Sequence, residues 1–272
     1  MKIDALWRDP RIQAAGWTPS EWNQVLESAV NVSRLDRIRE PERILSEIEI
    51  SAIFTLAERA SQGEPLGYIL EHAHFDGLLL SVSPDVLIPR PDTEVLLQAA
   101  LQCVAVDVPG HLLDVCTGSG ALALAFKTHH PSWRVVGSDI APEAIAVARR
   151  NGDRLGVSVE WVVTDLCDGL GQFDVIIANP PYIAIDDTRV EFSVSTYEPA
   201  LALFADNEGL AVIERLLKEA RSHLRPEGRL LIEHGPEQHG RIASAARKLG
   251  WLEIECRPDL AGRDRVTTMR FS

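Results

Sequence analysis

The sequence lacks any apolar run that could cross a membrane. A membrane-spanning helix needs roughly 18 consecutive apolar residues, and no stretch of these 272 residues approaches that length. The opening segment places Asp4, Arg8 and Asp9 where a secretory signal needs its apolar core. We therefore expect no membrane contact, no signal peptide and a cytoplasmic location.

Cysteine is scarce, and neither cysteine nor histidine is spaced like a metal site. The four cysteines form no C-x-x-C pair and have no histidine at ligand spacing. We expect no disulfide framework and no bound metal, since scattered thiols suit a reducing compartment. The residues considered are Cys103, Cys116, Cys167, Cys256, His72, His74, His129, His130, His234 and His239.

Positive charge is in deficit. Lysine and arginine number 27 against 40 aspartates and glutamates, which gives a net charge of −13. Such a chain repels a phosphate backbone at long range, so we expect no direct nucleic-acid binding through phosphates. An acidic enzyme that acts on a basic partner fits better, although acidity can also serve solubility alone.

The first 90 residues differ in pattern from the rest. Residues 18–31 begin with Thr-Pro, place a glutamate three positions after the threonine and then repeat apolar residues at helical spacing. Residues 41–62 predict a second, longer helix, and Asp76-Gly77 between two apolar runs predicts a hairpin turn. We expect a helical domain over residues 1–64 and a β-hairpin linker over 65–90.

Residues 91–272 alternate between strand-like and helix-like segments, which predicts an α/β domain with a parallel, doubly wound sheet. The last two strands have no helix between them and predict an antiparallel hairpin at the sheet edge. The expected strands cover residues 111–118, 133–140, 157–166, 173–183, 229–235, 251–259 and 265–271.

A glycine-rich loop follows the first of these strands. The strand ends in Asp114 and enters a helix through Cys116-Thr117-Gly118-Ser119-Gly120. Ligands of such sheets bind at the carboxyl ends of the strands, and glycines let the backbone approach them closely. The loop matches neither G-x-G-x-x-G nor G-x-x-x-x-G-K-[ST], which disfavours a dinucleotide and a phosphate-binding loop. Asp114 can alternatively be a buried acid that bonds the loop's own amides.

Acidic residues end the next two strands. Asp139 can accept hydrogen bonds from both ribose hydroxyls, or it can cap the following helix. Asp165 is placed to accept a hydrogen bond from the amine of an adenine, although acids also end strands in simple turns. One acid at the loop and another at the second strand suit a ligand with an ammonium group and a ribose. S-adenosylmethionine has both.

The fourth strand ends in Asn179-Pro180-Pro181-Tyr182, the most specific short string in the chain. An amide or aromatic amine nitrogen is a poor nucleophile because its lone pair is delocalised. The Asn179 side-chain oxygen and the Pro180 carbonyl can accept both N–H bonds of a planar NH₂ group, and Tyr182 can hold that group against its ring. Such positioning favours methyl transfer to the nitrogen. The alternative is a rigid turn without chemistry.

These motifs resemble the N-P-P-Y methyltransferases, which use S-adenosylmethionine and modify DNA bases or protein glutamines. Leu87–Glu94 (L-I-P-R-P-D-T-E) resembles a segment of the bacterial release factor glutamine methyltransferases of the HemK type. Gly63–Ile69, Glu198-Pro199 and Asp259–Val266 resemble their linker, post-catalytic loop and C-terminal signature. The resemblance implies a class I methyltransferase with a Rossmann-like seven-stranded sheet, a substrate-recognising helical domain and a hairpin linker.

The resemblance also implies a reaction and a set of site residues. The substrate is the glutamine of the Gly-Gly-Gln motif of peptide chain release factors, methylated on its side-chain amide by a chain that we expect to be a monomer. Asn179, Pro180 and Tyr182 then carry catalysis, and Pro181 and Arg90 add to the substrate site. The cofactor contacts are Asp114, Cys116, Thr117, Gly118, Ser119, Gly120, Asp139, Ile140, Asp165, Leu166 and Asn179.

Several alternatives stay open. The reaction can instead modify a nucleic-acid base or a ribosomal-protein glutamine, or the chain can bind the cofactor without catalysis. Arg90 can orient a ligand or pair with a linker acid, and Glu233 can support the site or make a structural bond. Thr93 and Glu94 are interpreted as helix-start residues. Relatives often have glycine at Cys116, where we expect only a small side chain to be needed, not a positive φ.

Overall fold

The computed structural model describes residues 1–105 and 108–272. The chain forms two compact units, which consist of residues 1–72 with 191–197 and of residues 73–190 with 198–272. The limits expected at residues 64 and 90 stay predictions. Nowhere in the two described ranges is there a helix long and apolar enough to span a bilayer.

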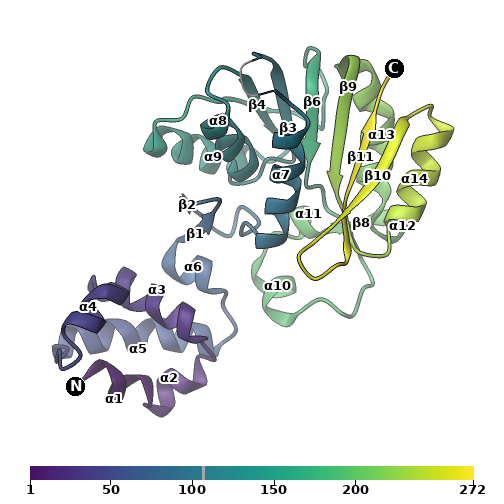
Figure 1. The fold of residues 1–272 in the computed structure, drawn as a ribbon. Coiled ribbons are helices and arrows are strands. Elements are labelled where there is room, and N and C mark those ends of the chain that lie inside the picture. The colour runs from purple at the N-terminus through teal and green to yellow at the C-terminus, as the bar shows by residue number, and fades with distance from the viewer. Residues whose placement is uncertain (106–107) are drawn as a thin grey trace. The chain divides into compact units, whose positions relative to one another are not determined.

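The first unit is helical, as the sequence predicted (Figure 1). Thr18, Ser33 and Ser46 each begin a helix with a capping box, in which side chain and backbone bond reciprocally. Buried tryptophan, leucine, isoleucine and valine side chains form its core. The helices are α1 (Ile3–Trp7), α2 (Pro10–Ala14), α3 (Pro19–Val30), α4 (Arg34–Arg39), α5 (Glu47–Ser61), α6 (Leu66–Leu70) and α10 (Phe192–Tyr197).

The prediction of a helix over residues 41–62 is wrong about where the helix begins. Helix α5 begins at Glu47, because the Ser46 hydroxyl accepts from the amide of Glu49 and the Glu49 carboxylate accepts from the amide of Ser46. This reciprocal cap satisfies amides that would otherwise lack partners, so the helix begins here and not at Pro41.

The predicted hairpin consists of β1 (His72–Phe75), whose first residue is the last of the first unit's residues 1–72, and β2 (Leu78–Ser81). Asp76 and Gly77 both have positive φ, as a tight two-residue turn requires. The short helix η1 (Pro91–Thr93) then leads into α7 (Glu94–Gln102).

A seven-stranded sheet forms the centre of this unit, in the order β10-β11-β9-β6-β3-β4-β5. The five strands from β9 to β5 are parallel, whereas β11 runs antiparallel to both of its neighbours, so the predicted sheet and its final hairpin are confirmed. The strands are β3 (His111–Val115), β4 (Arg134–Asp139), β5 (Glu160–Val163), β6 (Phe173–Ala178), β9 (Leu224–Glu233), β10 (Leu252–Pro258) and β11 (Asp264–Arg270).

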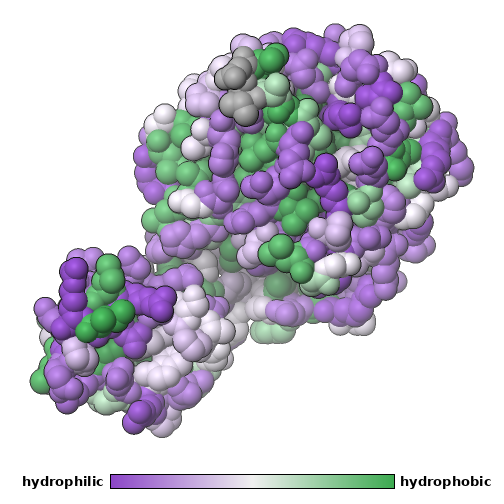
Figure 2. Space-filling view, viewed as in Figure 1, coloured by the Kyte–Doolittle hydropathy of each residue, from purple (hydrophilic) through white to green (hydrophobic). Residues whose placement is uncertain are grey.

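Helices cover both faces of the sheet (Figure 1). Side chains of α7 and α8 join the apolar core on one face, and those of α13 and α14 join the core on the other. Much of the surface visible in Figure 2 is hydrophilic, with separate apolar patches. The remaining elements are α8 (Ala121–His129), α9 (Pro142–Leu155), β7 (Ile183–Ala184), α11 (Ala200–Leu203), β8 (Phe204–Ala205), α12 (Asp206–Gly209), α13 (Ala211–His223) and α14 (His239–Lys248).

Strand β3 pairs with β4 on one side and with β6 on the other. The chain therefore extends the sheet from β3 through β4 to β5, then crosses back to β6 and extends it in the opposite direction. This reversal opens a crevice at the carboxyl ends of β3, β4 and β6. The glycine-rich loop, Asp139 and Asn179 follow these three strands, and the fold therefore brings them to one edge of the sheet.

Candidate active site

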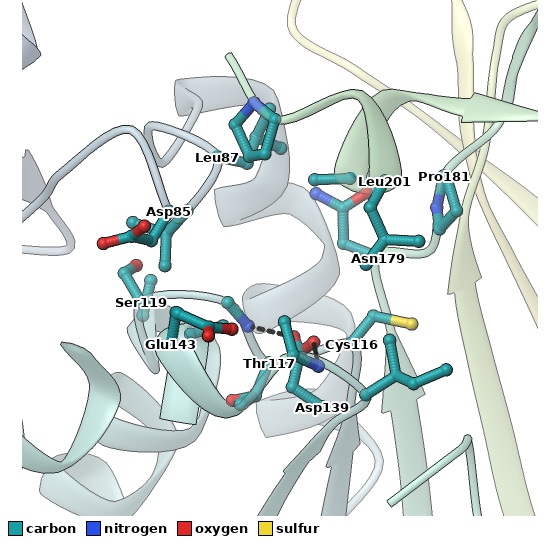
Figure 3. A pocket seen from close by; sticks show the side chains of 18 of the residues that line it. Asp85, Leu87, Cys116, Thr117, Ser119, Asp139, Glu143, Asn179, Pro181 and Leu201 are labelled. Carbon is teal, nitrogen blue, oxygen red and sulfur yellow. Dashed lines mark hydrogen bonds between the residues drawn. The ribbon is translucent and has the colours of Figure 1, made fainter. Parts of the chain in front are cut away.

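A cavity of about 420 Å³ occupies this crevice (Figure 3). Its volume lies within the usual range for a small-molecule site. The loop after β3, the turns after β4 and β5, and the residues after β6 form its walls, together with residues 84–93. Of the predicted site residues, it is lined by Arg90, Cys116, Thr117, Gly118, Ser119, Asp139, Ile140, Asp165, Leu166, Asn179 and Pro181.

The backbone of the glycine-rich loop is more strained than its sequence suggested. Cys116 has a φ of +58°, in the left-handed region, so the expectation that this position needs only a small side chain is wrong. An L-residue there costs roughly 1–2 kcal/mol relative to an ordinary conformation. Burial raises the pKa of the Cys116 thiol well above its usual value, and the nearby Asp139 and Asp114 add to the shift, so the thiol stays protonated.

Gly120 meets both a conformational and a steric requirement. Its φ is +82°, and a Cβ atom at this position would lie 2.7 Å from the ring of Trp161. Only glycine therefore lets the loop enter α8 at this angle. Gly120 shapes the cavity from behind, and it is not among the described residues that line the wall.

Asp139 holds the loop and faces the cavity (Figure 3). One carboxylate oxygen accepts from the amide of Gly118 at 2.9 Å, and the other accepts from the amide of Ala141 at 3.0 Å. Burial raises the pKa of this carboxyl, although these amides oppose the shift. Each oxygen has a second lone pair, so bonding within the chain and binding of a ribose hydroxyl are compatible.

Asp114 lies beneath the loop. Its side chain is fully buried and is not among the described residues of the cavity wall. One oxygen accepts from the Thr117 hydroxyl at 2.5 Å and from the amide of Ala123 at 3.1 Å. Burial raises the pKa of Asp114 to about 7. The geometry favours the interpretation in which this acid supports the loop, and direct contact with a cofactor stays a prediction.

Asp165 has a partner that the sequence did not reveal. Its carboxylate pairs with Arg215 of α13 at 2.8 Å, and both residues line the cavity. Leu166 follows in the left-handed conformation, with a φ of +50°, and turns its buried side chain to the same wall.

One of the two possibilities left open for Arg90, a structural ion pair, is confirmed, and its orientation of a ligand stays a prediction. Arg90 lines the cavity and forms an ion pair with Glu198, whose side chain is buried. The other oxygen of Glu198 accepts from the amide of Ile88 at 3.3 Å. Glu198 thus joins the segment around Arg90 to the segment that contributes Leu201 and Ala202 to the wall.

Asn179 and Tyr182 form hydrogen bonds with Thr93 and Glu233, two residues that the sequence did not single out as site residues. The Asn179 amide donates to the Thr93 hydroxyl at 3.2 Å, and the Tyr182 hydroxyl donates to Glu233 at 3.4 Å. Thr93 makes no side-chain cap to α7, so its interpretation as a helix-start residue is incomplete. The one feature of the sequence that could have indicated a role for Thr93 in the site is its place in the specific L-I-P-R-P-D-T-E string.

Two further residues of the N-P-P-Y string, Pro180 and Tyr182, differ in position from Asn179 and Pro181. Pro180 is buried, and Tyr182 packs against the apolar core on the α13 side of the sheet. Neither is among the described residues of the cavity wall, so a contact between the Tyr182 ring and a substrate stays a prediction. Burial raises the pKa of the Tyr182 hydroxyl, and the neighbouring Glu233 adds to the shift.

The cavity carries an excess of negative charge. Asp139 and Asp165 are joined by Asp85 and Glu143, whereas the two arginines of the lining each pair with a carboxylate. Asp85 and Glu143 were not foreseen, because they follow no recognised motif. The lining suits a cationic ligand and disfavours a phosphate.

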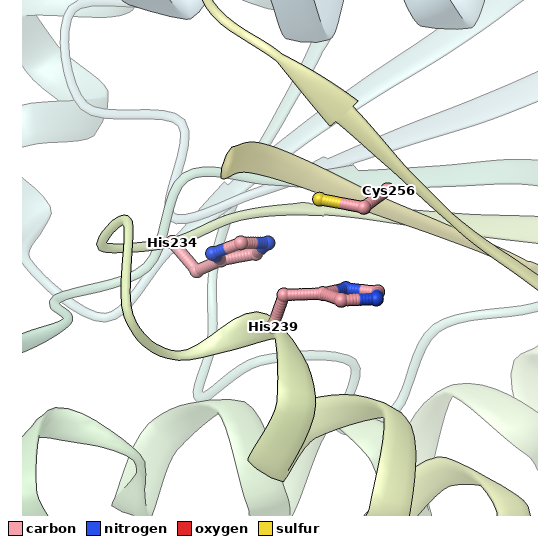
Figure 4. A group of neighbouring side chains, drawn as sticks. All are labelled: His234, His239 and Cys256. Carbon is pink, nitrogen blue, oxygen red and sulfur yellow. The ribbon is translucent and has the colours of Figure 1, made fainter. Parts of the chain in front are cut away.

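The fold brings three possible metal ligands together that the sequence keeps apart (Figure 4). Ligand atoms of His234, His239 and Cys256 lie within 4.8 Å of one another. The Thr267 hydroxyl bonds both imidazoles, at 2.8 Å to His234 and 2.9 Å to His239, and His234 also bonds the Gly235 carbonyl at 2.8 Å. These bonds tie the end of β9 and the start of α14 to β11, and the expectation of no bound metal stays a prediction.

The fold and the cavity define a class I methyltransferase of the Rossmann-like type. A methyltransferase from Pyrococcus furiosus has a similar structure, with a TM-score of 0.55, 21% identity and coverage of 72% of this chain and 89% of that one. The Thermus thermophilus 16S rRNA N2 G1207 methyltransferase, solved with AdoMet and guanosine, has a TM-score of 0.55, 17% identity and coverage of 74% and 50%. At these identities the likeness concerns the fold.

Sequence comparisons identify the family. Residues 92–201 match the methyltransferase small domain, and residues 13–70 match the PrmC N-terminal domain. The release factor glutamine methyltransferase of Vibrio cholerae is 40% identical, over 85% of this chain and 82% of that protein. That of Salmonella typhimurium is 37% identical over 85% and 84%. The chain belongs to the release factor glutamine methyltransferase family.

Proposed function

We propose that this chain methylates the side-chain amide of the glutamine in the Gly-Gly-Gln motif of peptide chain release factors, with S-adenosylmethionine as the methyl donor. One observation carries the proposal. Asn179, from the N-P-P-Y string, stands in the wall of the same cavity as the glycine-rich loop and Asp139. An amide acceptor and a cofactor site therefore share one chamber, and the relatives' names give the substrate.

The residues around the cavity fit S-adenosylmethionine. Asp139 offers free lone pairs to ribose hydroxyls, and Ile140 and Leu166 offer apolar surface to an adenine. A Cβ atom added to Gly118 would meet no atom within 4 Å, so the loop backbone is open to a ligand. The acidic lining favours the cationic ammonium and sulfonium groups. The cofactor in the related Thermus structure is consistent with this assignment.

The chain's own residues then act by orienting and shielding the substrate. When bound, S-adenosylmethionine supplies a sulfonium methyl group, which the glutamine nitrogen takes in exchange for one of its protons. The Asn179 oxygen and the Pro180 carbonyl accept the two N–H bonds of the glutamine amide, which holds its nitrogen toward the methyl donor. The same acceptors stabilise the positive charge that develops on this nitrogen. The leaving proton passes to water, so no strong base is needed.

The competing substrates can be separated by one assay. Purified chain is incubated with methyl-labelled S-adenosylmethionine and with a release factor, its Gly-Gly-Gln variant with glutamine replaced by alanine, a ribosomal-protein fraction or DNA. We expect label in the intact release factor alone. Label in DNA or in the ribosomal proteins but not in the release factor would contradict the proposal. Cofactor binding without any transfer would indicate a binding module. A monomeric state and a cytoplasmic location stay predictions.

A further inference from the structure

The N-P-P-Y string is held to the fold at both of its ends. Just before its start, Ala178 of β6 pairs with Val115 of β3 and with Ile232 of β9. At its other end, the Tyr182 carbonyl accepts from the side-chain amide of Gln238 at 2.9 Å. Gln238 follows shortly after the end of β9. Strand β9 and the turn after it therefore hold both ends of the string.

The side-chain amide of Gln238 has a single orientation that satisfies its partners. Its oxygen accepts from the backbone amide of Gly235 at 2.8 Å, and its nitrogen donates to the carbonyl of Tyr182 at 2.9 Å and to that of Glu208 at 3.1 Å. A carbonyl cannot donate and a backbone N–H cannot accept, so half a turn of the Gln238 amide would break all three bonds. Gln238 is thus a fixed link between the turn after β9 and the end of the N-P-P-Y string.

A left-handed segment packs against the same carbonyl. Asn207, Glu208 and Gly209 have φ values of +55°, +56° and +80°. Such conformations are unfavourable for residues other than glycine and persist where the surroundings hold them. Arg241 of α14 pairs with the Glu208 carboxylate at 2.7 Å. A Cβ atom at Gly209 would overlap the carbonyl oxygen of Tyr182, so this carbonyl is confined by backbone as well as by Gln238.

Two prolines make the string stiff between its two ends. The rings of Pro180 and Pro181 fix their φ angles, and each proline also restricts the backbone of the residue before it. Few backbone torsions are therefore free between Ala178 and Tyr182. As a result, the place of the Tyr182 carbonyl determines where the Asn179 side chain and the Pro180 carbonyl lie.

We propose that Gln238 is a positioning residue that, through the Tyr182 carbonyl, fixes the two acceptors of the N-P-P-Y string before the substrate arrives. The inference rests on the proposed function, in which the Asn179 oxygen and the Pro180 carbonyl accept the N–H bonds of the substrate glutamine. Gln238 is not among the described residues of the cavity wall, so it acts through the backbone of the string. Methyl transfer depends on the orientation of the amide, and small displacements of its acceptors are costly.

Three substitutions in the full chain separate this role from simple support of the fold. Gln238→Met keeps the length of the side chain and removes its hydrogen bonds. Gln238→Lys supplies donors for the Tyr182 and Glu208 carbonyls but no acceptor for Gly235. Gly209→Ala leaves Gln238 in place and sets a methyl group against the Tyr182 carbonyl.

The matched control is Gln102→Met, the same substitution at the end of α7. The side-chain oxygen of Gln102 accepts from Arg257 of β10, and neither residue is among those described in the cavity wall. For every variant, kcat and KM for a release factor are measured with methyl-labelled S-adenosylmethionine. Cofactor affinity is measured by calorimetry, and folding is measured as the urea midpoint of unfolding.

We expect Gln238→Met to lower kcat by roughly 10- to 100-fold, the scale of a misplacement by about 1 Å. KM and cofactor affinity should stay within about threefold, because the lost bond acts on orientation in the transfer step. Gln238→Lys should keep kcat within about fivefold of the wild type, since it restores a donor to the Tyr182 carbonyl. Gly209→Ala should lose about as much kcat as Gln238→Met, and Gln102→Met should have near-normal kcat.

Several results would overturn the inference while the proposed function stands. One is a folded Gln238→Met chain with kcat within about threefold of an active wild type. Another is a Gln238→Lys chain no more active than Gln238→Met, which would show that the donor to the Tyr182 carbonyl has no effect on transfer. A third is an equal loss of kcat in Gln102→Met.

A merely structural role of Gln238 would have a different result. The urea midpoint and cofactor affinity would fall together in Gln238→Met, while kcat per folded chain would not change. If Gln238→Met does not fold, Gly209→Ala and Gln238→Lys decide, and near-normal kcat in Gly209→Ala would contradict the inference. A wild type that binds the cofactor but does not methylate release factor would instead overturn the proposed function.

Discussion

Two residues of the cavity wall have left-handed backbone conformations, which residues other than glycine rarely adopt. Cys116 has a φ of +58° and Leu166 a φ of +50°, and each follows a strand that ends at the site. Such conformations persist only where the surrounding structure holds them, and they are concentrated at functional sites. The strain at Cys116 makes its substitution informative.

Replacement of Cys116 should depend on backbone freedom more than on side-chain chemistry. We expect Cys116→Gly to change the free energy of unfolding by less than about 1 kcal/mol, because relief of strain offsets lost packing. Cys116→Val should lower it by about 2 kcal/mol or more, since a β-branched residue fits positive φ poorly. Urea unfolding measures both. Equal effects of the two substitutions would contradict the strain argument.

Asn179 should be indispensable for transfer but not for folding. We expect Asn179→Ala to lower kcat by about 100-fold or more, because a preorganised acceptor for the developing charge is lost. Asn179 is only partly buried, so the unfolding midpoint should change little. Single-turnover methylation of release factor, with calorimetric cofactor binding as the folding check, measures the effect. Turnover within tenfold of the wild type would contradict the mechanism.

At the scale of secondary-structure elements, Asn151 of α9 connects three segments near the site by hydrogen bonds. Its side-chain oxygen accepts from the amide of Ser81 at 2.7 Å, and its nitrogen donates to the carbonyls of Ser81 and Ser119, each at 3.0 Å. Strand β2, helix α9 and the glycine-rich loop therefore meet at one fully buried amide. Such a buried network stabilises only while all of its members are present.

Removal of this junction should affect both stability and the cofactor site. Asn151→Ala removes the partner of three backbone groups, two on half-buried Ser81 and one on buried Ser119, and we expect a loss of about 2–4 kcal/mol in the free energy of unfolding. Cofactor affinity should fall as well, because Ser119 belongs to the cavity wall. The control is Arg150→Ala on the exposed side of α9, which should change stability by about 0.5 kcal/mol at most. Equal effects of the two substitutions would count against the junction.

The stability of the whole molecule should respond to pH through its buried acids. Burial raises the pKa values of Asp114 and Glu233 to about 7 each, well above the ordinary values of 3.8 and 4.5. The native state therefore holds these protons more tightly than the unfolded chain does. Their contribution to stability is complete below the ordinary pKa values and is lost as pH rises through about 7.

Asp114→Asn isolates one of these two acids. Asparagine keeps an acceptor for Thr117 and Ala123 but does not ionise. Between pH 5 and 7 we expect the stability of the wild type to fall by about 2 kcal/mol relative to this variant, given 1.36 kcal/mol per pKa unit. Urea unfolding of both chains across this range measures the difference. A stability difference that does not vary with pH would show that Asp114 is ionised throughout.

Local sequence patterns predicted the helices, strands and turns better than they predicted the contacts between these elements. The capping box at Thr18, the Asp76-Gly77 turn and the strand before Asn179 were all readable, because each depends on neighbouring residues. The start of α5 was misjudged because Pro41 and Ser46 both resemble helix starts, and only the cap at Ser46 forms. Elements were thus predictable where a single local signal was present.

The sequence by itself determined the α/β alternation, the family and the principal site motifs, since these depend on periodicity and on short contiguous strings. Only the tertiary structure decided that Thr93 bonds the Asn179 amide, that Arg215 pairs with Asp165, and that Cys116 is strained. These contacts join segments up to 86 residues apart, from Thr93 to Asn179. Their partners are chosen by strand order and packing, which no local pattern records.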